Sequence, residues 1–154
     1  MATDETKRAA QEFLAVRLSE EVQQEEERLN RQAAQTMANR VWNRVAETFN
    51  AKCKAWNAVT KEESLTCKDT IMGDLRIRCA GKTHMITVHF DSRKLQVIVR
   101  NTARPEHESD SVFTIEGYNG GTEADLSRNN QRVNLEVVVL GELRVLAGIG
   151  RTAK

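Results

Sequence analysis

Hydrophobic and polar positions follow two different patterns along the chain, and the change comes near residue 70. Before it, apolar residues recur every three or four positions, which is the spacing of an amphipathic helix. After it, apolar and polar residues alternate, which indicates strands with one buried face. The pattern predicts an α+β protein of one domain, residues 1–154, in which an N-terminal helical segment packs on an antiparallel sheet of about five to six strands.

The distribution of glycine and proline supports this division. The first 72 residues contain neither, whereas all eight glycines and Pro105 follow. Because these two residues interrupt regular helices most strongly, a long stretch without them favours helix. Thr3, followed by Asp4 and Glu5, has the side chains expected at a helix N-cap and first turn.

One straight helix could not bury the whole apolar stripe of the N-terminal segment. At about 100° per residue, the stripe from Leu14 to Trp56 drifts by about 240° around a helix axis. Two helices, or one helix bent near residues 30–36, would each keep an ordinary buried face. The sequence therefore predicts an acidic helical arm over residues 1–35 and a core helix over residues 36–60.

The predicted arm has a thin apolar stripe bordered by glutamates. Its candidate oligomerisation residues are Leu14, Leu18, Val22 and Leu29. A helix draws most of its stability from packing. A stripe as thin as this one therefore needs a covering surface. The arm is expected either to dock on its own domain or to pair with a second copy, and we favour a role in oligomerisation. A solvated, partly frayed arm is the alternative.

Three runs of alternating residues open the predicted sheet, which spans residues 74–147. If Gly81-Lys82 forms a two-residue turn, Ile77 lies opposite Ile86, and a similar turn at Ser92-Arg93 places Phe90 opposite Leu95. Both pairings put the alternating apolar residues of the three runs, such as Leu75, Val88 and Val97, on one face.

The rest of the chain is less regular. Residues 64–73 are expected to form a connector, residues 112–118 a fourth strand, and residues 122–131 a polar stretch with a helical turn. Residues 133–140 read as a fifth strand, apolar on both faces. For residues 141–150, strand and helix both remain open.

The second face of the three-strand meander combines arginines with apolar residues. Its candidate interaction residues are Arg76, Arg78, Met85, Ile98 and Arg100. Arginine and methionine are enriched at protein interfaces, which favours a protein partner. A solvated face is the alternative. The arginines could also neutralise phosphates of a nucleic acid, but the face lacks the aromatic side chains on which bases usually stack.

The net charge of +1 conceals an uneven distribution. Residues 1–30 carry four basic and eight acidic side chains, whereas residues 31–104 carry fourteen and six. Such an asymmetry fits an anionic partner, or an acidic arm that lies against the basic middle of its own chain or of a sister subunit. We favour the self-complementary interpretation.

No motif predicts catalysis, a metal or a cofactor. His84 and His89 point to opposite faces of one strand and cannot share a metal ion. His84 is expected in the core beside Cys79, and His89 is expected to pair with Asp74 across the sheet. No phosphate-binding, hydrolase, zinc-protease or Cys-x-x-Cys motif occurs, so the expected cofactors and metals are none. An enzyme or small-ligand pocket between helix and sheet, built from scattered residues, stays open as an alternative.

Cysteine content and hydropathy bear on location. The three cysteines are an odd number, and the start of the chain does not resemble a secretory signal, so a reducing cytoplasm is expected. The longest apolar run, residues 137–140, is far shorter than the ~20 residues of a membrane span. We therefore expect a cytoplasmic protein-interaction or oligomerisation module without catalytic activity, most simply a homo-oligomer, that does not bind membranes.

Overall fold

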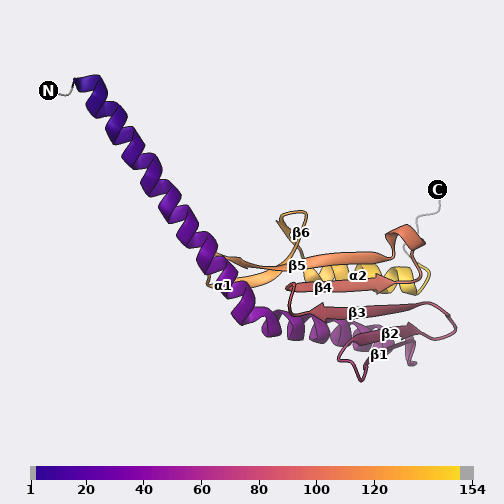
Figure 1. The fold of residues 1–154 in the computed structure, drawn as a ribbon. Coiled ribbons are helices and arrows are strands. Elements are labelled where there is room, and N and C mark those ends of the chain that lie inside the picture. Colours follow the sequence, from indigo (N-terminus) through magenta and orange to yellow (C-terminus); the bar gives the residue numbers. More distant parts are fainter. Residues whose placement is uncertain (1–2, 150–154) are drawn as a thin grey trace.

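The computed structural model describes residues 3–149, and it joins one long helix to a single antiparallel sheet (Figure 1). The expected α+β class is confirmed. The elements in chain order are α1 Asp4–Thr60, β1 Leu65–Asp69, β2 Leu75–Cys79, β3 Met85–Asp91, β4 Gln96–Asn101, a 3₁₀ turn Glu106–Glu108, β5 Asp110–Tyr118, β6 Glu123–Arg128, β7 Gln131–Arg132 and α2 Leu135–Leu146.

The sheet is a meander in which each strand pairs with the next, in the order β1 to β7. The expected strand number was too low, since the described residues form seven strands. Residues 64–73 contain β1 rather than a plain connector, because Asn57 of α1 holds both backbone polar groups of Leu65. Residues 122–131 form a hairpin of β6 and β7 rather than a helical turn.

The first predicted hairpin has the expected register, and the second does not. Ile77 lies opposite Ile86 as predicted, but Phe90 lies opposite Val97 instead of Leu95. The loop is four residues long because the Asp91 carboxylate accepts the backbone amides of Arg93 and Lys94, both at 3.1 Å. A shift of two residues leaves the same side chains on the buried face, so the predicted core of the meander survives the change of register.

The expected fifth strand over residues 133–140 was wrong, since Leu135 begins helix α2. The Asn134 side chain accepts the backbone amide of Val137 at 3.3 Å and caps this helix. Val139, Leu143 and Leu146 are its buried apolar residues, at the spacing of one helix face. Residues 141–149 are thus helix followed by a short turn, and Gly150 lies outside the described residues.

Both helices cover the same face of the sheet. Their buried side chains join those of the strands in one core, from Ala34 and Phe49 of α1 to Leu143 of α2. The other face carries no helix within residues 3–149 (Figure 1). The protein therefore has two layers, with one sheet face buried and one open.

A buried polar cluster fastens α2 to the end of β4. Glu142 is only 5 % exposed, and Arg104 donates to both of its carboxylate oxygens, at 2.8 and 3.1 Å. Asn101, which is fully buried, donates to the backbone carbonyl of Glu142 at 3.0 Å. The hydrogen bonds from the Arg104 guanidinium and the Asn101 amide offset the free-energy cost of removing the Glu142 carboxylate from water.

Of the two alternatives for the N-terminal segment, the bent helix is the one that forms. α1 is continuous but changes direction where it reaches the sheet (Figure 1). Within the predicted region of residues 30–36, the Thr36 hydroxyl donates to the carbonyl of Gln32 at 3.0 Å. Such side-chain bonds to the preceding turn often bend helices. Thr3 is the N-cap as predicted, and it accepts the amide of Thr6 at 3.2 Å.

Candidate functional site

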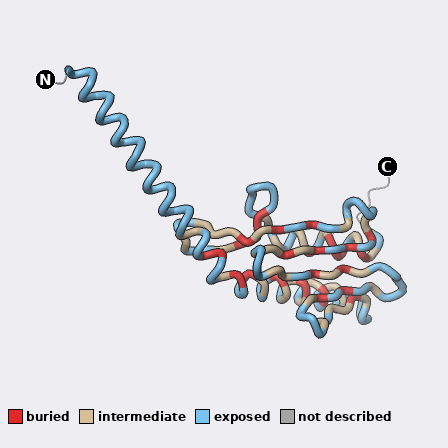
Figure 2. Tube along the Cα trace, in the orientation of Figure 1, coloured by how far each residue is buried: buried red, intermediate tan, exposed pale blue. Residues whose placement is uncertain are grey.

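Of the arm predicted over residues 1–35, residues 4–28 of α1 stand clear of the sheet, and the name arm is used for these residues from here on. Every residue in it is exposed, and Figure 2 shows the arm in one unbroken pale-blue run until it meets the sheet. Its large apolar side chains are 54–65 % exposed: Phe13, Leu14, Val16, Leu18 and Val22. Isolated apolar side chains on a surface are ordinary, but a cluster on one unsupported helix is typical of a binding surface.

The arm leaves the sheet at a tight junction with the hairpin that joins β5 to β6. Gly121, at a φ of +87°, donates its amide to the side-chain oxygen of Asn30 at 2.9 Å. Gly117 lies so close to α1 that a Cβ there would come within 2.1 Å of the Asn30 carbonyl oxygen. The two glycines let the hairpin contact the helix backbone directly, and this contact sets where the arm begins.

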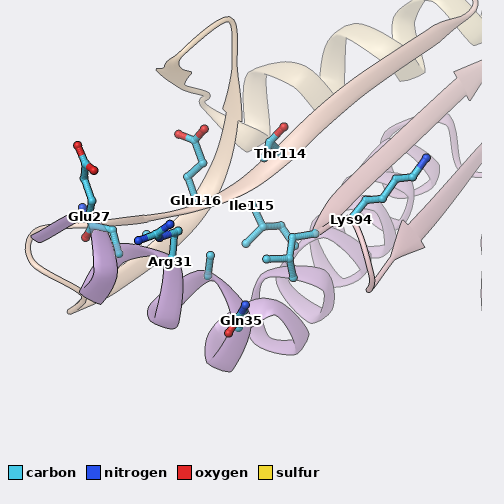
Figure 3. Close-up of a pocket in the computed structure, with 11 residues that line it drawn as sticks. Glu27, Arg31, Gln35, Lys94, Thr114, Ile115 and Glu116 are labelled. Carbon is cyan, nitrogen blue, oxygen red and sulfur yellow. The ribbon is translucent and has the colours of Figure 1, made fainter. Parts of the chain in front are cut away.

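A hollow of about 520 Å³ lies beside this junction (Figure 3). Glu27, Arg31 and Gln35 of α1 border it on one side, and Thr114, Ile115 and Glu116 of β5 border it on the other, with Lys94 at its far end. Its lining mixes both charges with apolar surface and contains no histidine or cysteine.

The predicted interaction residues of the meander lie on the open sheet face. Arg78 lies opposite Met85, and Arg76 lies opposite Thr87, as expected. Arg100, however, lies beside Thr87 rather than beside Met85, because the register of β3 and β4 is shifted.

Arg100 is also paired within the chain. It donates two hydrogen bonds to Asp110, at 2.7 and 2.9 Å. This ion pair raises the pKa of Arg100 and lowers that of Asp110. Of the three predicted arginines, Arg76 and Arg78 therefore remain available to a partner.

A second hollow, of about 550 Å³, gathers cations at the β1 edge of this open face. Lys68, Arg76 and Arg78 line it, and no ion pair forms to any of them within residues 3–149. Lys68 and Arg76 are direct cross-strand neighbours, an arrangement in which like charges repel. Ile71 and Met72, at the tip of the adjoining hairpin, are 104 % and 86 % exposed.

The sequence pattern does not single out Lys68, Ile71 and Met72, because it predicts a connector over residues 64–73 where the structure has strand β1. The signal was present in Leu65, Cys67 and their alternation with polar neighbours. The run is too short to stand out by periodicity alone.

The histidines do not form a site. His84 is exposed, not buried beside Cys79 as expected, because the turn that holds it lies outside the β2–β3 ladder. His89 pairs with Asp74 at 2.6 Å, as expected of a cross-strand pair. No cluster within the described part of the chain has the three side chains needed to hold a metal ion.

Cys53 of α1 and Cys67 of β1 face one another in the core. Their hydrogen bond, together with burial, raises the pKa of the Cys53 thiol well above its usual range. The same hydrogen bond lowers the pKa of Cys67. Cys53 is 3 % exposed, so it acts as a small core residue.

Comparison with known proteins adds no functional information. No helix among the described residues has the length and apolar character needed to cross a membrane. No protein family model matches the chain, and neither a curated protein nor a solved structure does so. The features that bear on function are therefore the arm, its junction with the β5–β6 hairpin and the open sheet face.

Proposed function

We propose that this protein is a cytoplasmic interaction module that self-associates through the arm, residues 4–28, and has no catalytic role. One observation carries the proposal: every residue of the arm is exposed, five large apolar side chains among them. The three free cysteines are compatible with a reducing compartment.

The energetics of an isolated helix support a partner for the arm. Helices in water are marginal when nothing packs on them, and most helix stability in proteins comes from an apolar face that is covered. All residues from 4 to 28 are exposed, and Leu14, Leu18 and Val22 follow one another at helical spacing. Association would remove this surface from water and stabilise the helix at the same time.

The test is the molar mass in solution of the full chain at micromolar concentration and physiological salt. Light scattering after size-exclusion chromatography should give at least twice the 17.4 kDa of one chain. A variant with Leu14→Glu, Leu18→Glu and Val22→Glu should give the mass of one chain, because three charges replace the apolar stripe. Val59→Glu, at an 83 % exposed apolar position outside the arm, is the matched control and should keep the wild-type mass.

Two results would refute self-association through the arm. One is a wild-type protein that elutes with the mass of a single chain. The other is an arm variant that keeps the full wild-type mass, since the contact between copies would then lie elsewhere.

Nucleic-acid binding is a second candidate function, favoured by the cation hollow. Lys68, Arg76 and Arg78 lack ion-pair partners in the described chain, so they are free to neutralise phosphates. Single-stranded RNA or DNA should then be retained at low salt and released as salt rises. Arg76→Glu with Arg78→Glu should abolish retention, whereas Arg100→Ala should leave most of it, because Asp110 already occupies Arg100. Negligible retention of the wild type at low salt would exclude this candidate.

A further inference from the structure

The arm carries a stripe that extends beyond its apolar residues. Its members on the arm are Lys7, Gln11, Leu14, Leu18, Val22 and Glu25, and Leu29 continues it into the junction, where it is half-buried beside Gly121. At about 100° per residue they lie within an arc of about 80°. Lys7, Leu18 and Leu29 are eleven residues apart, and an eleven-residue repeat keeps a stripe nearly straight along a helix. The stripe therefore has the geometry of a helix-pairing seam.

We propose that the stripe pairs with the same stripe of a second copy in the antiparallel orientation, with Leu18 facing Leu18 of that copy. This inference rests on the proposed self-association and names its partner and orientation. A second copy fits this stripe because, when two arms run in opposite directions, basic residues of one arm come opposite acidic residues of the other.

The seam residues favour the antiparallel orientation. With Leu18 at the centre, Leu14 faces Val22 of the second copy, Gln11 faces Glu25, and Lys7 faces Leu29. In a parallel pair in register, each residue would face its own copy. Glu25 would then face Glu25 and Lys7 would face Lys7, so that like charges would meet in the seam. Polar and charged residues at such positions are known to set orientation in helix pairs.

The charged residues that flank the seam also favour the antiparallel orientation. On one side of the stripe, Arg17 comes opposite Glu21 of the second copy, and on the other side Arg8 comes opposite Glu26. The twofold symmetry of such a pair repeats both contacts.

The flanking side chains are able to form these contacts. Arg17 and Glu21 are 3.6 Å apart on one helix and more than half exposed, so each can also reach a partner. Arg8 and Glu26 make no ion pair within the described residues and lie on the exposed arm. Opposite charges at flanking positions select the partner and its orientation in paired helices.

The arm direction leaves the stripe uncovered from Lys7 to Glu25, and the β5–β6 hairpin lies beside it only at Leu29. Figure 1 shows the arm running away from the sheet, so that two antiparallel arms would hold their sheets at opposite ends. The 25 residues of the arm span about 37 Å at about 1.5 Å per residue. Phe13 and Val16 lie on the opposite side of the arm and stay uncovered in a pair, so two pairs could further associate through them without changing the seam.

Cysteine cross-linking in the full chain tests the orientation. Leu14→Cys and Val22→Cys proteins are prepared separately, one with a mass tag, and oxidised alone and as a mixture, with oxidised wild type as the background for the native cysteines. The mixture should give a cross-linked species of mixed mass, and each variant alone should stay at background. In the antiparallel pair, Leu14 lies eight residues, or about 12 Å, from Leu14 of the second copy, beyond the ~4.4–6.8 Å between Cα atoms of a disulfide.

A parallel pair would give the reverse result, with each variant cross-linking alone, and would overturn the inference. Absence of any cross-link in the mixture, in a protein whose mass still depends on the arm, would overturn it as well. Neither result touches the proposed self-association. That proposal fails only if the wild type has the mass of one chain, or if the arm variant keeps the wild-type mass.

Charge exchange provides an independent readout that does not depend on disulfide geometry. Arg8→Glu places like charges opposite Glu26 and should weaken dimerisation about tenfold, measured by sedimentation at several concentrations. Adding Glu26→Arg to the same chain should restore the affinity to within about threefold, because the pair is re-formed with its charges exchanged. If the double variant is as weak as Arg8→Glu alone, this pairing register is wrong.

Discussion

The two halves of α1 carry similar apolar side chains but differ in what covers them. Phe49 in the second half is 1 % exposed, whereas Phe13 in the first half is 65 % exposed. Both lie on one continuous helix with the same backbone hydrogen-bonding pattern. The difference shows that the sheet covers the apolar side chains of the second half, whereas those of the arm are exposed to solvent.

The largest expected effect is the difference in the free energy of unfolding when one aromatic ring is removed from each half of α1. Phe49→Ala should lower the free energy of unfolding by about 3–5 kcal/mol, since it leaves a cavity in the core. Phe13→Ala should change it by less than about 0.5 kcal/mol, because the ring is exposed. Denaturant unfolding followed by circular dichroism measures both. Equal losses for the two variants would show that the arm is packed after all.

The junction between the halves should give an intermediate effect. Gly117→Ala puts a methyl group where the carbonyl of Asn30 lies, and helix or hairpin must move to admit it. Overpacking of this kind costs about 1–3 kcal/mol. Gly141→Ala, in α2 where a Cβ meets nothing within 4 Å, is the matched control and should be neutral or slightly stabilising. A neutral Gly117→Ala would mean that the close contact at the base of the arm is not required.

The smallest expected effect lies at the tip of the arm. Thr3→Ala removes the hydroxyl that accepts the amide of Thr6 and should weaken the first helical turns locally by about 1 kcal/mol. The free energy of global unfolding should stay within about 0.3 kcal/mol of the wild type, because nothing in the core depends on this end. Hydrogen exchange resolves the two quantities. A clear loss of global stability would instead couple the tip of the arm to the core.

Prediction from sequence succeeded where the signal was local. The helical spacing up to Thr60, the cap at Thr3 and the alternation from Leu75 onward each depend on neighbours within a few residues, and each is present in the structure. The need for a bend near residues 30–36 followed from the drift of the stripe alone. Of the four predicted oligomerisation residues, Leu14, Leu18 and Val22 are exposed, whereas Leu29 is half-buried beside Gly121. Their role in oligomerisation stays a prediction.

Prediction from sequence failed where contacts between residues far apart in the chain decide the local structure. Val137 to Leu140 is a run of β-branched and aliphatic residues that suits a strand, yet the cap at Asn134 and the core beneath Val139 and Leu143 make it part of α2. β1 forms because Asn57 holds Leu65, eight residues further along the chain. The cation hollow depends on this missed strand, since Lys68 meets Arg76 only across the β1–β2 pair.

The sequence by itself determined the α+β class, which alternate residues of the meander are buried, and the difference between an acidic arm and a core helix. These follow from hydrophobic periodicity and from the positions of glycine and proline, which act over short distances along the chain. Only the tertiary structure decided the register of β3 and β4, the helical state of α2 and the close fit of Gly117 against Asn30. Those features depend on which side chains pack against one another across the core. Short-range sequence patterns are compatible with several such packing arrangements.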